Sequence, residues 1–202
     1  MSKLQFLRND NVTRGYGVLE NFLSHRRSHL ADRLIPENSR EGKILDIGCG
    51  SVHFFLNHIS FEKKYGIDKI PNKNIKDINF LNHDFEVVSD LPFTDNFFDV
   101  ITLLAVIEHI NPEKVLPLMT EIRRILKDNG ILILTTPAAW SDSLLRFMAK
   151  LKLVSPVEIK EHKDIFTPKK LSNIMTQSGF QPDKIRTGYF ECFANIWLQA
   201  KK

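Results

Sequence analysis

Short apolar runs alternate with amphipathic segments along most of the chain, and this pattern predicts strands and helices in turn. Residues 44–47, 64–68, 80–84, 97–104 and 131–135 are apolar runs of a length typical of buried strands. Apolar residues at helical spacing predict helices over 18–35, after residue 53, from about 114 to 126, and from 167 to 178. Thr167 is the expected N-cap of the last of these helices, with Pro168 at its first position. The alternation predicts an α/β fold with a doubly wound, mostly parallel sheet.

Two helix-breaking residues and the pattern of the C-terminal segment refine these elements. Pro117 is compatible with a helix that begins near Lys114, because a proline in the first turn has no amide donor to lose. Gly130 is expected to end that helix before the fifth strand. Residues 180–199 predict two strands without a helix between them, so we expect the sheet to end in a C-terminal antiparallel hairpin.

The first predicted strand leads into a turn that carries two glycines, Gly48 and Gly50. A strand, a glycine turn and a helix let the backbone approach a ligand at the carboxyl edge of a parallel sheet. Asp46 stands just before the turn, where a carboxylate would repel a phosphate. The turn therefore favours a cationic or hydroxyl-rich ligand.

Acidic residues end three successive predicted strands, namely Asp46, Asp68 and Asp84. Asp68 follows Asp46 by 22 residues, a spacing suited to a carboxylate that accepts hydrogen bonds from two ribose hydroxyls. A nicotinamide dinucleotide satisfies this spacing as well. Asp84 ends the third of these strands, and its side chain and the amide of Phe85 are suited to an adenine, with the Phe85 ring packed on the base.

Composition adds modest limits. The 202 residues, 43% hydrophobic and 26% charged, fit a single domain over 1–202. A formal charge of +4 is too small to indicate nucleic acid by itself. Two cysteines, no zinc-type Cys/His spacing and no apolar run of about 18 residues predict a cytoplasmic protein with no metal site and no transmembrane segment.

Several motifs in one order carry a family resemblance. The glycine turn is followed by Leu-Pro-Phe-Thr-Asp-Asn-Phe-Phe-Asp at 91–99, a hydrophobic-Glu-His motif at 104–110, and His-Lys-Asp-Ile-Phe-Thr-Pro at 162–168. Together they resemble the type 11 branch of the class I S-adenosylmethionine-dependent methyltransferases, which includes quinone-biosynthesis methylases. Val52 departs from the family pattern, because it stands where a third glycine is usual.

The resemblance implies a seven-stranded Rossmann-like sheet, a cofactor and the residues that hold it. S-adenosylmethionine would be bound and S-adenosylhomocysteine would be the product. The methionine moiety would lie against Gly48 and Gly50, with its ammonium facing Asp46. The remaining cofactor residues would be Asp68 for the ribose, Asp84 and Phe85 for the adenine, and Leu104 and Ala105 beneath the sulfonium.

The methyl acceptor is expected to be a small molecule, of an apolar, lipid-linked or sugar type. An oxygen acceptor must lose its proton, and His109 and His162 are the histidines placed to remove it. His162 is the preferred general base, while His109 could equally orient its loop by hydrogen bonds.

Two segments lie outside the core pattern. Residues 1–38 would form an N-terminal helical cap, and residues 140–165 a basic, amphipathic helical insertion that is either a lid or a helix packed on the sheet. As a lid, its residues 141–153 could contact a membrane peripherally. Two alternatives stay open for the whole chain: a catalytically impaired methyltransferase-like binding protein and an NAD(P)-dependent oxidoreductase. The spacing of the glycines counts against the oxidoreductase.

Overall fold

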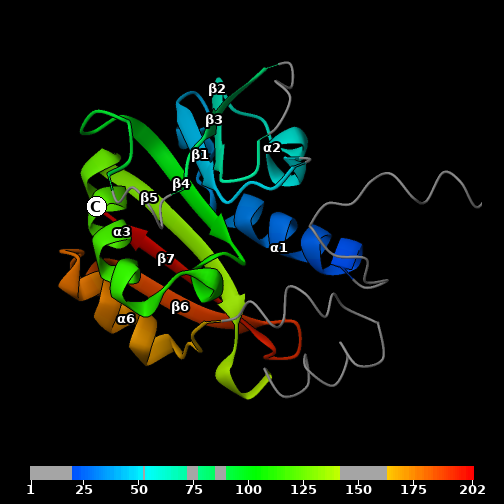
Figure 1. Cartoon of the computed structure of the whole chain (residues 1–202), viewed down its shortest axis with the longest axis vertical. Helices are drawn as coiled ribbons and strands as arrows, with labels where there is room; N and C mark the ends of the chain where they lie inside the picture. The colour runs from blue at the N-terminus through cyan, green and yellow to red at the C-terminus, as the bar shows by residue number, and fades with distance from the viewer. Residues whose placement is uncertain (1–19, 52, 72–76, 85–89, 142–162) are drawn as a thin grey trace, which may run out of the picture.

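A seven-stranded sheet forms the centre of the protein in the computed structural model, which describes residues 20–51, 53–71, 77–84, 90–141 and 163–202 (Figure 1). The strands are β1 (Lys43–Ile47), β2 (Lys63–Asp68), β3 (Ile78–Asn82), β4 (Phe98–Leu104), β5 (Leu126–Pro137), β6 (Ile185–Phe190) and β7 (Asn195–Lys201). Their order is β3-β2-β1-β4-β5-β7-β6. β7 alone runs opposite in direction to the other six strands, which confirms the doubly wound sheet and its antiparallel C-terminal hairpin.

The described α-helices are α1 (Glu20–Leu34), α2 (Phe54–His58), α3 (Pro112–Ile125) and α6 (Pro168–Gln177). Short 3-10 turns are η2 (Glu37–Ser39), η3 (Ile107–His109), η4 (Ala139–Ser141) and η5 (Pro182–Lys184). The side chain of Thr167 accepts a hydrogen bond from the amide of Lys170 at 3.2 Å, and Pro168 occupies the first helical position of α6. The predicted threonine cap and proline start are therefore confirmed. None of the described helices is long and apolar enough to cross a bilayer.

Alternation along β1 divides the core into two layers. Leu45 and Ile47 pack in the cluster that includes the buried faces of α3 and α6, whereas Ile44 packs with α1 and α2 on the other side. Because successive side chains of a strand point to opposite faces, Asp46 shares the α1 face of the sheet with Ile44. Asp46 is the one acidic residue of β1, and it therefore lies on the face of the sheet that α1 covers.

Three predicted boundaries differ from the structure. Helix α3 begins at Pro112, so Pro117 lies inside the helix and not in its first turn. This position is tolerated because Pro117 is exposed and water can reach the carbonyl that its missing amide leaves without a partner. The helix already ends at Ile125, and Gly130 lies within β5, beside an irregularity in its pairing with β4.

The third predicted strand is also shifted by two residues. In the structure β3 spans Ile78–Asn82, since Lys64 to Asp68 of β2 pair with it in parallel register. Asp84 therefore lies two residues beyond the strand and does not end it.

Candidate functional site

The loop after β1 is shaped by two left-handed glycines, Gly48 at φ 73° and Gly50 at φ 69°. The amide of Gly48 donates to the carbonyl of Ile67 at 2.8 Å, so the loop is tied to the end of β2. A Cβ added at Gly48 would stand 2.5 Å from Cγ2 of Val106. Glycine is required here for two reasons: the left-handed backbone and the close approach of the segment that follows β4.

Asp46 is a buried carboxylate at the floor of this loop, with 4% of its surface exposed. Its Oδ1 accepts a hydrogen bond from the hydroxyl of Thr102 on β4 at 2.6 Å. Burial raises the pKa of Asp46 to about 7, the Thr102 hydrogen bond opposes the rise, and the nearby charge of Asp68 adds to it. A cation placed at this carboxylate would stabilise its charged form.

Asp68, the last residue of β2, links the glycine loop to the next segment. Its Oδ2 accepts from the amide of Gly50 at 3.0 Å, and its Oδ1 accepts from the amide of Ile70 at 2.9 Å. Each carboxylate oxygen has two acceptor positions, so one on each oxygen is left for a ligand as far as the described residues are concerned. This arrangement suits a pair of vicinal hydroxyls.

The segment after β3 is brought to the same place. The amide of His83 and the side-chain amide of Asn82 both donate to the carbonyl of Asp68, each at 3.0 Å. Asp84, half-buried, follows directly and thus lies next to the Asp68 segment. Phe85 lies outside the described residues.

The end of β4 forms another wall of the site. Leu104 is half-buried, and Ala105 has a left-handed backbone at φ 58°. The amide of Ala105 donates to the carbonyl of Thr135 on β5 at 3.0 Å. This bond turns the chain back at the carboxyl edge, so that Val106 packs beneath Gly48.

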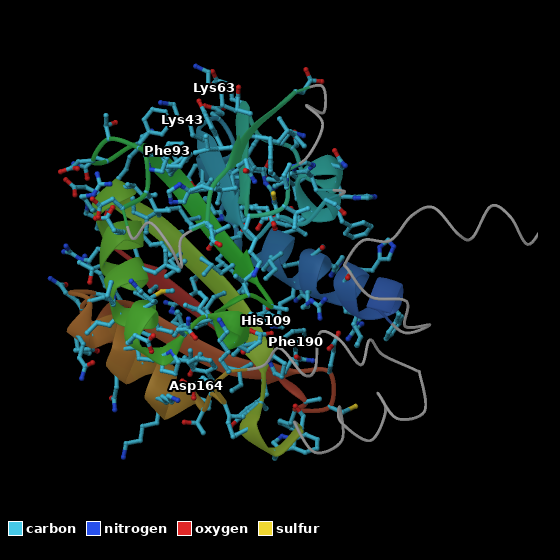
Figure 2. All side chains as sticks on the ribbon, in the orientation of Figure 1. Lys43, Lys63, Phe93, His109, Asp164 and Phe190 are labelled. Carbon is cyan, nitrogen blue, oxygen red and sulfur yellow. The ribbon has the colours of Figure 1, made fainter. Side chains whose placement is uncertain are left out.

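The Glu-His motif forms η3 at the same edge, and Figure 2 shows His109 there, at the end of the sheet opposite Lys43. Glu108 is buried, and its Oε2 accepts a hydrogen bond from the hydroxyl of Thr136 at 3.0 Å. The carbonyl of Glu108 accepts from the amide of Lys163 at 2.8 Å. His162 lies outside the described residues, as do residues 142–162 of the predicted insertion.

Comparison with known proteins identifies the family that uses such a site. The sequence profile described as "Methyltransferase domain" matches residues 19–185. The chain belongs to the class I S-adenosylmethionine-dependent methyltransferases. The match decides against the oxidoreductase alternative, and the cofactor of this methyltransferase domain is S-adenosylmethionine.

Solved methyltransferases share the fold at low sequence identity. A chain from the complex of the Haloferax volcanii Trm112 methyltransferase activator with a methyltransferase is 14% identical, with a TM-score of 0.69 and 91% of both chains covered. A S-adenosylmethionine-dependent methyltransferase from Archaeoglobus fulgidus is 18% identical, with a TM-score of 0.64 and coverage of 91% of this chain and 97% of that one. A third, from Thermotoga maritima, is 23% identical, with a TM-score of 0.63 and coverage of 90% and 92%.

Two uncharacterised proteins of Methanocaldococcus jannaschii are closer in sequence over a shorter stretch. One is 33% identical over 113 residues, which are 54% of this chain and 46% of the relative. The other is 32% identical over 108 residues, which are 50% of this chain and 40% of the relative. The chain thus matches less than half the length of these relatives.

The structure brings together three features that were expected from the sequence: the glycine loop, Asp46 and Asp68. Two contributors were missed. Thr102 could have been noticed as a polar residue inside an apolar strand, two positions before Leu104. His53 is fully buried at a left-handed φ of 49°, and burial lowers its pKa while the charge of Asp68 opposes the change. No sequence signal marked His53.

Cys49, between the two glycines, contributes to packing. Burial is the main cause that raises its pKa, and the charges of Asp46 and Asp68 act in the same direction. The thiol is therefore protonated near neutrality and is a poor nucleophile. Within the described ranges, no group of three or more histidine, cysteine or acidic side chains is placed to hold a metal ion.

Proposed function

We propose that the protein transfers the methyl group of S-adenosylmethionine to a small-molecule acceptor of an apolar, lipid-linked or sugar type. The strongest support is that two acids with different surroundings lie at one edge of the sheet. Asp46 is buried with no cationic partner among the described residues, and Asp68 has two acceptor positions that those residues do not fill. Asp46 suits the ammonium of the methionine moiety, and Asp68 suits the two ribose hydroxyls. Asp84 with Phe85 is the proposed adenine site.

The remaining residues of the site position the reaction. When bound, S-adenosylmethionine supplies an electrophilic methyl group. Leu104 and Ala105 would shape the floor beneath it and exclude water, which favours a displacement in which charge is dispersed. Glu108, through Thr136 and Lys163, would hold the turn that bears His109.

A base is needed when the acceptor is a hydroxyl. His162 is proposed to take this proton, with His109 as the next candidate. The described chain resumes at Lys163, whose amide is bonded to the residue before His109, and this supports testing the two histidines together. We also propose a cytoplasmic location, supported by the two free thiols, Cys49 and Cys192.

The first experiment is a thermal-shift comparison of S-adenosylhomocysteine, S-adenosylmethionine and NAD. The first two should raise the melting temperature and NAD should not. Stabilisation by NAD alone would refute the proposal.

The second experiment measures turnover across a panel of apolar, lipid-linked and sugar acceptors. His162→Ala should lower turnover by about a hundredfold or more if His162 is the base, with cofactor affinity nearly intact. Cofactor binding without turnover on any acceptor would favour the catalytically impaired binding protein.

A further inference from the structure

Large exposed apolar side chains are concentrated on one part of the surface. Six such side chains occur among the described residues, and four of them are Trp140, Ile165, Tyr189 and Phe193. Trp140 is 55% exposed and Phe193 is 67% exposed. A soluble domain rarely gathers side chains of this size without a partner.

The four residues belong to three segments that are bonded to one another. The indole nitrogen of Trp140 donates to the carbonyl of Phe193 at 2.8 Å, and the rings of Tyr189 and Phe193 are 5.8 Å apart. The amide of Ala139 donates to the carbonyl of Phe166 at 3.1 Å, which joins the Ile165 segment to η4. We call these four residues the aromatic surface.

The turn between β6 and β7 presents Phe193 at a cost in backbone strain. Glu191, Cys192 and Phe193 all have left-handed backbones, at φ 51°, 54° and 67°. A non-glycine residue in this region is strained, because its Cβ lies too close to the following carbonyl oxygen. Asparagine would be less strained and more soluble at position 193, so folding alone does not explain a phenylalanine there.

Hydrogen bonds from the β5 side hold this strained turn in place. The amide of Ala138 and the hydroxyl of Ser141 both donate to the carbonyl of Ala194, at 2.8 and 2.7 Å. The carboxylate of Glu191, the acid of the turn, accepts from the side chain of Asn195, and its Oε1 is buried. The two exposed residues of the turn are Cys192 and Phe193, whereas Glu191 is half-buried.

Basic residues flank the aromatic surface. The segment 163–170 carries three lysines and one aspartate, a net charge of +2. Asp164 is paired with Lys170, while Lys163 and Lys169 are exposed. Aromatic side chains beside cations are the combination that binds the interface of a bilayer with anionic headgroups.

We propose that the aromatic surface docks the protein on a membrane that carries anionic lipids. The surface follows the carboxyl end of β5, the strand whose Thr135 carbonyl is bonded to Ala105. Docking would therefore face the cofactor edge of the sheet toward the bilayer, from which an apolar acceptor could be drawn. Binding to vesicles is measured without turnover, so the test is independent of the proposed transfer.

The test is co-sedimentation of the full chain with vesicles of phosphatidylcholine containing about 30% phosphatidylglycerol, compared with pure phosphatidylcholine. The protein should bind the anionic vesicles, less so at high salt, and the fluorescence of exposed Trp140 should shift to the blue. Phe193→Asn should reduce the partition coefficient by about fivefold or more, because an apolar ring no longer enters the interface.

The Asn variant should fold at least as well as the wild type, so a loss of binding cannot come from unfolding. Leu116→Gln is the matched control, since Leu116 is an exposed apolar residue of α3, outside the aromatic surface. It should change vesicle binding by less than about twofold. Lys169→Glu should weaken binding to anionic vesicles only.

Three results would overturn the proposal: no vesicle binding by the wild type, equal binding after Phe193→Asn, or equal losses in Phe193→Asn and Leu116→Gln. A dimer that Phe193→Asn disrupts, with no vesicle binding, would assign the aromatic surface to a second copy of the chain.

Discussion

Acidic side chains at the two edges of the sheet have different kinds of partner. At the amino edge, both oxygens of Asp99 accept from Nζ of Lys127, at 2.9 and 2.8 Å. At the carboxyl edge, Asp46 is bonded to a neutral hydroxyl and Asp68 to two backbone amides. Figure 2 shows the separation of these ends, with Lys43 and Phe93 at one and His109 and Phe190 at the other.

The same contrast is visible in acid strength. Hydrogen bonding to Arg124 is the largest cause that lowers the pKa of Glu121, near the amino edge. Burial raises the pKa of Asp46 to about 7. The amino edge is thus complete without a ligand, whereas the carboxyl edge has a carboxylate whose charge is not balanced among the described residues. A cationic ligand would balance that charge. Substitutions at the amino edge should therefore change the stability of the protein, and substitutions at the carboxyl edge should change its affinity for the cofactor.

The largest expected effect is at the amino edge, in Arg124→Ala. Arg124 donates to the carbonyls of Leu91 and Phe93 and pairs with Asp95 and Glu121. Its loss should reduce the free energy of unfolding by about 3 kcal/mol, because carbonyls of the loop before β4 lose a charged donor. Chemical denaturation measures this change.

The affinity for S-adenosylhomocysteine should stay within about twofold in folded Arg124→Ala, because the substitution is remote from the cofactor edge. Lys63→Ala is the control, since the Lys63–Glu62 pair is solvent-exposed and 3.9 Å long. It should cost less than about 0.5 kcal/mol. A large loss of affinity in Arg124→Ala would contradict the claim that the amino edge affects stability and not cofactor binding.

The next effect is at the carboxyl edge, in Asp68→Ala. The variant loses the acceptors proposed for both ribose hydroxyls and the bond that fixes Gly50. Cofactor affinity should fall by about 1–3 kcal/mol, measured by calorimetry.

Asp99→Ala, an acid removed from the other edge, is the matched control and should reduce stability without changing affinity. Unchanged affinity in Asp68→Ala would show that the ribose binds elsewhere.

A smaller effect is expected for the stability of the cofactor-free protein as pH changes. Because the folded pKa of Asp46 is raised, its favourable contribution is complete below the unfolded value of 3.8 and is lost as pH rises through about 7. Asp46→Asn keeps an acceptor for Thr102 without the charge. Between pH 5 and pH 8 the Asn variant should gain stability relative to the wild type by on the order of 1 kcal/mol, because only the wild type loses stability as pH rises through about 7.

Thermal unfolding at both values of pH checks the difference. An equal advantage of the Asn variant at both would mean that the charge of Asp46 is already balanced in the cofactor-free protein.

Much of this architecture could be predicted from local pattern. Glycine spacing and strand-end acids indicated the turn after β1 and the position of Asp68 at the end of β2, because both depend on residues close in sequence. The Thr167 cap followed from helix-start chemistry. Pro117 was misplaced because Pro112 already supplies the first-turn proline, and an exposed second proline is tolerated.

The bonds that define the site electrostatically are long-range and could not be predicted in this way. Thr102 and Asp46 are 56 positions apart, and their contact depends on the register of β1 against β4. Asp84 was assigned to a strand end because nothing local shows that β3 pairs from Ile78. The absence of a cationic partner for Asp46, within the part of the chain that the structure describes, is a property of tertiary packing.

Calorimetry of S-adenosylhomocysteine binding near pH 7, in two buffers with different ionisation enthalpies, tests the central claim most directly. If the ligand's ammonium pairs with Asp46, the side-chain carboxyl of Asp46 must lose its proton when the ligand binds. The two buffers should then report proton release, and this release should disappear well above pH 7 and in Asp46→Asn. Affinity should correspondingly rise with pH through about 7 in the wild type alone. Binding without proton release, or with the same release in Asp46→Asn, would contradict the assignment of Asp46 to the cofactor's ammonium.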